Sequence, residues 1–303
     1  MITKFSLTFS LLFVLGLYAQ KREYKGLEAL QMLQKTVCNT LEEGKSVYGM
    51  WEGRMYSRIE GEKDKNIFNV IGINVRQCDC VEDQVKGKGF RSVGREIMLY
   101  LDPETGEILD TWENPWTGEK VEVLHVANDP VSMRNYIYEN DDKGEERATF
   151  SFRQYGDVAV TSYEYPLFYN NPLAGEYQNA IGGKYHAMEI FNTYYSTEEI
   201  TNPNIKNLNT SSISWSRISQ WLPWMNMGGK QGIMVVNSTG QSVLNKDEIW
   251  PRIQEILADR YPLYANPPEK DDKRPNETSW TVYKKHIAAK EKTKGETEKK
   301  GNH

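Results

Sequence analysis

A histidine, an asparagine and an aspartate lie within five residues of one another, at His125, Asn128 and Asp129. A buried imidazole beside a carboxylate is a common arrangement for a general base that is held in one tautomer. Val121, Val123 and His125 share one face of a segment with a strand's period of two, so we expect the imidazole to point inward. Asn-Asp-Pro is also a turn sequence. The alternative is therefore that His125 is a hydrogen-bonded core residue, while Asn128 and Asp129 only shape the turn.

Glu189 and Arg217 form a second candidate pair. In a strand, Glu189 shares a face with Tyr185, and Arg217 shares one with Trp215. A carboxylate on such a face is either enclosed, with a raised pKa and an acid/base role, or at an edge. Arg217 can pair with Glu189 or hold an anionic ligand. The plainer alternative is an ion pair that satisfies both charges.

Tryptophans supply candidate pocket walls. The segment WLPWMNMGG at 221–229 combines two tryptophans with two methionines, which suits an adaptable apolar wall or lid. It can equally plug one end of a barrel. We take Trp221 and Trp224, together with Trp112 and Tyr185, as candidate ligand-binding residues.

The sequence lacks the motifs of several large enzyme classes. It contains no G-x-G-x-x-G, P-loop, G-x-S-x-G or H-E-x-x-H, which disfavours nucleotide-dependent chemistry, serine hydrolysis and zinc proteolysis. A net charge of -5 offers no basic field for nucleic acid. With three cysteines, four histidines and no C-x-x-C, we expect neither a metal site nor a cofactor.

Most of the chain has the pattern of short strands. A helix is expected over 24–43, about ten strands between 46 and 240, and a second helix, capped by Asn245, from 246 to about 260. The expected strands lie at 47–55, 68–76, 95–101, 107–112, 121–127, 148–155, 158–165, 185–195, 212–219 and 232–237. The sequence predicts a mostly β fold, an antiparallel calycin-like barrel or strongly curved sheet with N- and C-terminal helices. The calycin analogy comes from Gly49-Met50-Trp51 in an early strand.

The two ends of the chain differ from its middle. Residues 1–19 have the composition of a signal peptide, and no other run is apolar enough to cross a membrane. Residues 20–268 are expected to form a single β-rich domain, followed by a Lys- and Glu-rich tail at 269–303 that is disordered or a lone helix. We therefore expect an exported protein, periplasmic or extracellular. A disulfide from Cys38 to Cys78 or to Cys80 is possible in that environment.

Three blocks of sequence resemble one family. They are YLDPETGEILDTWENPWTGEKVEVLHVANDPV at 100–131, GGKYHAMEIF at 182–191 and SWSRISQWLPWMNMGG at 214–229. Together, over roughly residues 46–268, the chain resembles a bacterial and fungal family catalogued as domain of unknown function 1838. The resemblance implies an architecture and a set of recurring residues, and no settled activity. The matching positions are Trp112, Asn114, Pro115, His125, Asn128, Asp129, Pro130, Glu189, Trp221, Pro223, Trp224, Met225 and Gly228.

Three functions remain open from the sequence. The first is a barrel that encloses a small, largely apolar organic ligand. It can be an enzyme of isomerase, cyclase or lyase type, with His125 as general base, Asp129 or Asn128 orienting it, Glu189 as a second acid/base group and Arg217 stabilising negative charge. The second is a carrier of a lipid or an aromatic molecule without turnover. The third is a glycan- or surface-binding module, which predicts a row of exposed aromatic side chains. The oligomeric state is left open.

Overall fold

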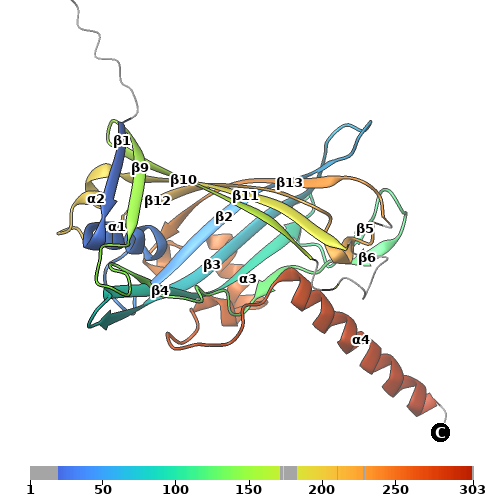
Figure 1. Ribbon diagram of the computed structural model, residues 1–303. Coiled ribbons are helices and arrows are strands. Elements are labelled where there is room, and N and C mark those ends of the chain that lie inside the picture. The colour runs from blue at the N-terminus through green and yellow to red at the C-terminus, as the bar shows by residue number, and fades with distance from the viewer. Residues whose placement is uncertain (1–19, 171–172, 174–182, 210, 228, 302–303) are drawn as a thin grey trace, which may run out of the picture.

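The computed structural model describes residues 20–170, 173, 183–209, 211–227 and 229–301; the expected signal peptide at 1–19 lies outside them. Eleven antiparallel strands form one sheet in the order β1-β9-β10-β11-β12-β13-β2-β3-β4-β7, with β8 paired to β4 (Figure 1). The strands are β1 (Gln20–Lys25), β2 (Ser46–Arg58), β3 (Lys65–Asp83), β4 (Gly87–Leu101), β7 (Val126–Asn128), β8 (Ile137–Tyr138), β9 (Thr149–Tyr155), β10 (Val158–Asn170), β11 (Lys184–Ser196), β12 (Ser211–Ser219) and β13 (Ile233–Val243). A separate hairpin pairs β5 (Thr111–Glu113) with β6 (Lys120–Glu122).

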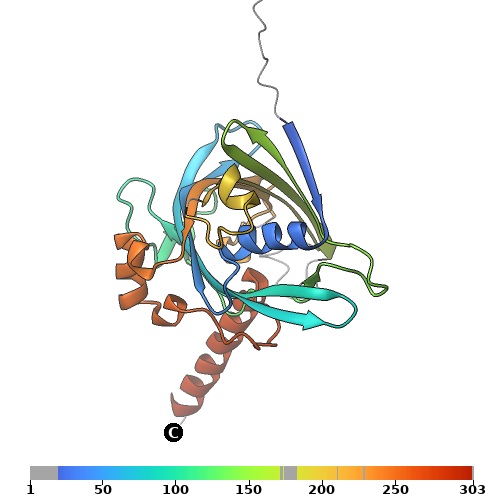
Figure 2. The same cartoon turned by 90° about the vertical axis from the view of Figure 1, so that its left-hand side faces the viewer.

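The sheet is strongly curved. Seen from one end, its strands wrap around the first helix, α1 (Gly26–Cys38) (Figure 2). Among the strands that the structure describes, the hydrogen-bonded path ends at β1 on one side and at β7 and β8 on the other. The antiparallel, mostly β fold is therefore confirmed, whereas closure into a calycin-like barrel is not.

Alternation along β2 gives the sheet an inner and an outer face. Val47 and Met55 belong to two apolar clusters on the inner face, whereas Tyr48 and Met50 belong to one on the outer face. Trp51 lies on the inner face, as its period predicts. A Cβ on Gly72 would lie 2.4 Å from the Trp51 ring, so this indole requires a glycine on the neighbouring strand.

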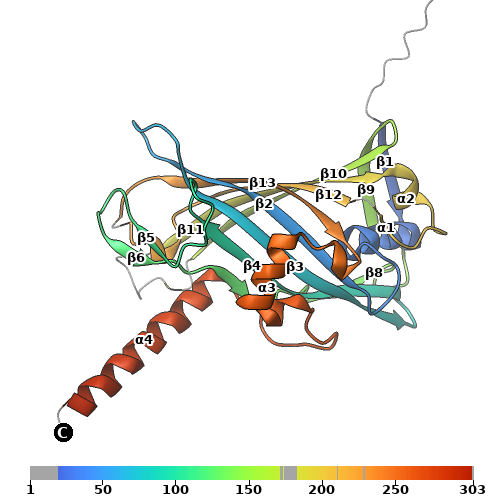
Figure 3. The same ribbon diagram turned by 180° about the vertical axis from the view of Figure 1, so that it is seen from behind.

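Three apolar clusters hold the fold together. The first packs α1 against β3, β4, β9 and β10, and the second packs β2–β4 against α3 (Pro251–Asp259), which covers the outer face (Figure 3). The third lies at the end of the sheet near β5 and β6, and it includes the 3-10 turn η1 (Pro223–Met225) and the start of α4 (Ser279–Gly301). The inner face thus has an apolar cluster towards each end.

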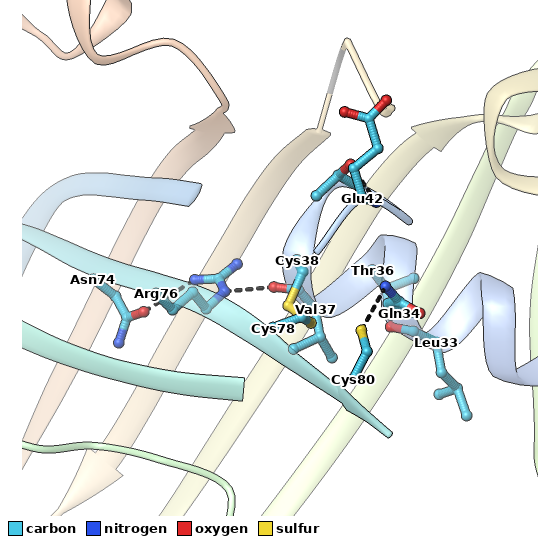
Figure 4. Close-up of a disulfide and its surroundings, with 11 residues drawn as sticks. Leu33, Gln34, Thr36, Val37, Cys38, Glu42, Asn74, Arg76, Cys78 and Cys80 are labelled. Atoms are coloured by element: carbon cyan, nitrogen blue, oxygen red, sulfur yellow. Dashed lines mark hydrogen bonds between the residues drawn. A yellow bond between two sulfur atoms is a disulfide. The ribbon is translucent and has the colours of Figure 1, made fainter. Parts of the chain in front are cut away.

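A disulfide attaches α1 to the sheet. Asn39, with a φ of 52°, ends the helix well before Gly44, where the sequence suggested a stop. Cys38 bonds to Cys78 of β3, and Cys80 keeps a free thiol close to Gln34 (Figure 4). This resolves the alternative that the sequence left open between the two partners.

Two predicted elements are each divided in the structure. The expected strand 121–127 is divided between β6 and β7, because residues 123–125 leave the ladder. The expected helix 246–260 is a 3-10 turn, η2 (Lys246–Glu248), followed by α3, since Pro251 starts a new helix at its first position. Asn245 caps η2 alone.

Short helical segments and α4 complete the chain. These are α2 (Thr197–Thr201) and the 3-10 turn η3 (Pro262–Ala265). The polar tail contains α4, whose Trp280 and Tyr283 are buried in the cluster near β5 and β6. None of the helices in the described part of the chain is both long and apolar enough to cross a bilayer.

Candidate functional site

His125 binds the backbone of β4. Its Nδ1 accepts a hydrogen bond of 3.1 Å from the Tyr100 N–H, and this assigns the neutral ring a proton on Nε2. Nε2 is itself buried, and no described residue accepts its hydrogen bond with good geometry. Burial, and then the Arg260 guanidinium, lower the pKa of His125 to about 4, against the opposing effects of Asp110 and the Leu109 backbone. The imidazole is therefore neutral at neutral pH.

Asp129 is engaged by two arginines. Its Oδ1 lies 3.0 Å from Arg95 Nε and 3.0 Å from an Arg274 terminal nitrogen, and the side chain is only 14% exposed. The peptide bond to Pro130 is cis. Among the described hydrogen bonds, none joins His125 to Asp129 or to Asn128, so the orientation of the imidazole that the sequence suggested is not formed. His125 and Asp129 therefore bind different partners: His125 binds the β4 backbone, and Asp129 binds Arg95 and Arg274.

Glu189 and Arg217 meet on the inner face, as their shared face predicts. They are directly opposite each other on β11 and β12, with 3.0 Å between Oε1 and a guanidinium nitrogen. A second guanidinium nitrogen donates to the Tyr185 hydroxyl at 2.5 Å. Trp280 of α4 packs edge-on against the Tyr185 ring, with 5.1 Å between centroids. The Glu189–Arg217 ion pair, which was the plainer alternative from the sequence, is thus present, with Tyr185 as an additional partner.

A third charged residue, Glu96, joins this pair across the interior. Glu96 lies on the inner face of β4 opposite Asn128, whose amide donates to its Oε1 at 3.0 Å. Asn74 also hydrogen-bonds the Glu96 carboxyl, and Glu189 and Arg217 both act on its charge. Burial is the main cause that raises the pKa of Glu96. We call Glu96, Glu189 and Arg217 the inner charged group.

The inner charged group is deep in the protein yet incompletely covered. The side chains of Arg217 and Glu189 are 30% and 22% exposed, and Glu96 is half-buried. All three are on the inner, concave face of the sheet, so their accessible area lies on that side. Ion pairs buried in a filled core have no such area. A water molecule can therefore contact these side chains.

Aromatic rings continue from the inner charged group across the sheet. Tyr165 of β10 contacts Phe191 of β11, which stacks on Trp215 of β12, and Trp215 meets Trp51 of β2 edge-on. The centroid distances are 5.8, 6.3 and 6.3 Å in that order. Tyr165 is 50% exposed and the other three rings are half-buried. We call these four residues the aromatic row.

The three tryptophans predicted as pocket walls pack in the cluster near β5 and β6, which also contacts Trp51 and Trp215 of the aromatic row. Trp224 is 6% exposed and packs on Trp112 in the cluster near β5 and β6. Trp221 lies at its margin, in contact with Trp116, and donates from its indole to the Lys230 carbonyl. Trp221 and Trp224 therefore pack mainly on other side chains of this cluster.

Sequence reasoning missed Glu96 and the aromatic row. The signal for Glu96 was weak, because a single acidic residue in REIMLYL looks like an edge position. The signal for the row was available, since Tyr165, Phe191, Trp215 and Trp51 all occupy the inward period of their strands. In the described residues, no group of three or more His, Cys, Asp and Glu side chains is placed to hold a metal ion.

Fold and site together define a curved antiparallel β protein with charged and aromatic groups on its inner face. A family model described as "Protein of unknown function (DUF1838)" matches residues 44–287, and the chain belongs to this family. The search of curated proteins finds no match. Among solved structures, the crystal structure of Ail, the attachment invasion locus protein of Yersinia pestis, is similar at 8% identity. The match covers 67% of this chain and 100% of Ail, and its TM-score of 0.17 supports no argument about fold or function.

Proposed function

We propose that the curved sheet acts as a barrel-like container for a small organic ligand that has an apolar or aromatic body and an acidic group. The observation that supports this most strongly is the aromatic row beside Arg217, both deep in the protein and both partly accessible. Phe191 and Trp215 are cross-strand partners, and Glu189 and Arg217 are the next inward pair along the same two strands. A ring stacked on Phe191 and Trp215 therefore lies about 7 Å from Arg217, the spacing of two residues in a strand.

Arg217 keeps hydrogen-bonding capacity for such a ligand. A guanidinium carries five N–H donors, and Glu189 and Tyr185 occupy two of them. These partners also hold the side chain in one position, which reduces the entropy lost when a ligand binds. The rings supply apolar contact area with little loss of side-chain freedom. The combination favours a planar or hydrophobic acid.

A carrier role is our first proposal, and an acid/base enzyme of isomerase, cyclase or lyase type is the second. The enzyme alternative is supported by two carboxyls, Glu96 and Glu189, that lie in one interior with different hydrogen-bond partners. His125 is not part of it, because its Nδ1 already accepts the Tyr100 N–H. A glycan-binding surface is not proposed, since the aromatic row lies on the inner face.

We also propose that the protein is exported, with residues 1–19 removed. The Cys38–Cys78 disulfide supports this, because such bonds persist in oxidising compartments. The check is amino-terminal sequencing of the protein recovered from its native cells together with fractionation. Export predicts a mature chain that starts at Gln20 outside the cytoplasm, and a full-length cytoplasmic chain contradicts it.

Titration with an uncharged fluorescent probe tests the container. N-phenylnaphthylamine is expected to bind, and Phe191→Ala or Trp215→Ala should weaken binding about tenfold by removing one stacking surface. Tyr194→Ala is the matched control, because Tyr194 is on the outer face of β11 and 41% exposed. If the inner and outer variants change the affinity equally, or if the probe does not bind, the inner-face site is wrong.

A further inference from the structure

Glu96 has no cationic partner of its own. Among the described residues, no lysine or arginine forms an ion pair with it, whereas Glu189 is paired with Arg217. Its contacts are the amides of Asn128, at 3.0 Å, and of Asn74. Amide hydrogen bonds offset only part of the cost of enclosing a charge, so an ionised Glu96 is expensive here.

We propose that Glu96 is a second ligand-contacting residue, which carries its proton in the ligand-free protein at neutral pH and uses it to donate a hydrogen bond to the anionic group that Arg217 attracts. This inference rests on the proposed function and names the ligand class more closely: an organic anion whose binding weakens as Glu96 ionises. Glu96 then sets the specificity of the site for anions and the pH at which an anion is released.

The surroundings of Glu96 account for its proton. Burial raises its pKa most, the Glu189 charge raises it further, and the hydrogen bonds from Asn128 and Asn74 and the Arg217 charge lower it. Arg76, the nearest cation along β3, bonds to the Val37 carbonyl and to Asn74 Oδ1 (Figure 4). Asn74 therefore separates this guanidinium from the carboxyl, and its amide nitrogen is left to face Glu96.

Because the Glu96 side chain is partly accessible, its protonated carboxyl can donate a hydrogen bond to a bound anion. The side chain is half-buried on the inner face, and the charges of Arg217 and Glu189 both act on it, so Glu96 lies near the position that a ligand group on Arg217 would take. A neutral carboxyl donates one hydrogen bond to an anion, whereas a carboxylate offers no donor and repels it. Binding of an anion therefore favours the protonated form, and the two equilibria are linked.

A pair of probes with the same rings tests the anion preference. Anilinonaphthalene sulfonate keeps its negative charge across the accessible pH range, and N-phenylnaphthylamine is its uncharged counterpart. The wild type is expected to lose about tenfold in affinity for the sulfonate from mildly acidic to mildly alkaline buffer, with little change for the uncharged probe. Glu96→Gln should bind the sulfonate with no such loss, because glutamine stays neutral and keeps a donor.

The result that overturns the inference is an equal pH dependence of sulfonate binding in the wild type and in Glu96→Gln. If the uncharged probe binds in these same experiments, the container proposal survives that failure. Arg217→Met gives the complementary comparison: it should weaken the sulfonate more than the uncharged probe. Equal weakening of both probes contradicts the anion preference.

A measurement without ligand decides the protonation state directly. Infrared difference spectra of the wild type minus Glu96→Gln should show the stretching band of a protonated carboxyl at neutral pH, replaced by carboxylate bands as the pH rises. Carboxylate bands alone at neutral pH would show Glu96 ionised and overturn the inference, whether or not either probe binds.

Discussion

The protein has two sets of polar residues that could do chemistry: His125 with Asp129, and the inner charged group. They differ in how much of each side chain is left accessible by its contacts with other residues. His125 accepts a strand N–H, and Asp129 is held by Arg95 and Arg274. On the inner face of the curved sheet, the side chains of Arg217 and Glu189 are 30% and 22% exposed. The sequence drew attention to the first set because histidine is the usual base. Residue type alone is therefore a weak guide to a ligand site. A polar side chain is a better candidate when part of it is accessible to a ligand.

The largest expected effect of this difference is on stability. Asp129→Ala leaves the Arg95 guanidinium, whose side chain is 8% exposed, without its carboxylate, so we expect a loss of about 3 kcal/mol in the free energy of unfolding. Probe affinity in the folded protein should stay unchanged. Urea unfolding measures the first and fluorescence titration the second. As a control, Asp110→Ala removes a 75% exposed carboxylate and should cost under about 1 kcal/mol. Similar losses of stability in the two variants would contradict the view that the enclosed Asp129 contributes more to stability than the exposed Asp110.

A medium effect concerns the pH dependence that His125 causes. Its pKa is lowered from 6.5 to about 4, so between these values the unfolded chain binds a proton that the folded protein does not. Stability therefore falls as the pH drops through this window, by up to about 1.4 kcal/mol per pH unit. His125→Asn retains an acceptor for the Tyr100 N–H and removes the titration. The unfolding free energy of this variant should be flatter with pH than that of the wild type, and identical slopes would show that the ring does not titrate as described.

The smallest effect has the opposite sign. The pKa of Glu96 is raised, so its contribution to stability is complete below the ordinary carboxyl range and is lost as the pH rises through the raised value. Glu96→Gln should remove this slope and be more stable than the wild type by about 1 kcal/mol once Glu96 is ionised. Equal stability of the two proteins in alkaline buffer would show that the carboxylate is well accommodated.

Much of the fold could be predicted from the sequence, because alternating strands leave a clear signal. The inward faces of β2, β11 and β12 follow from a period of two, which places Glu189 and Arg217 on the same face and makes their pairing possible. The full lengths of β3 and β4 could not be predicted. The end of β3 and the start of β4, which pair with each other, carry polar residues such as Gln77 and Asp79 of β3, and such residues are typical of loops. Those segments are ordered by this pairing, and Asp79 by its ion pair with Arg91.

The site was only half predictable, for a related reason. Glu189, Arg217 and Tyr185 lie on two neighbouring strands, so local pattern was enough to group them. Glu96 and Asn128 reach them across the interior, which depends on how strongly the sheet curves. No local pattern encodes that curvature. The contacts of His125 were not predictable, because residues 123–125 leave the ladder and the ring bonds the Tyr100 N–H of β4 rather than Asp129.

The most direct test of the central claim is a crystal structure of the protein with anilinonaphthalene sulfonate. The account predicts the naphthalene rings against Phe191 and Trp215 and the sulfonate within hydrogen-bonding distance of Arg217 and Glu96. A probe bound only on the outer face, or an interior filled by protein side chains at that position, would contradict it.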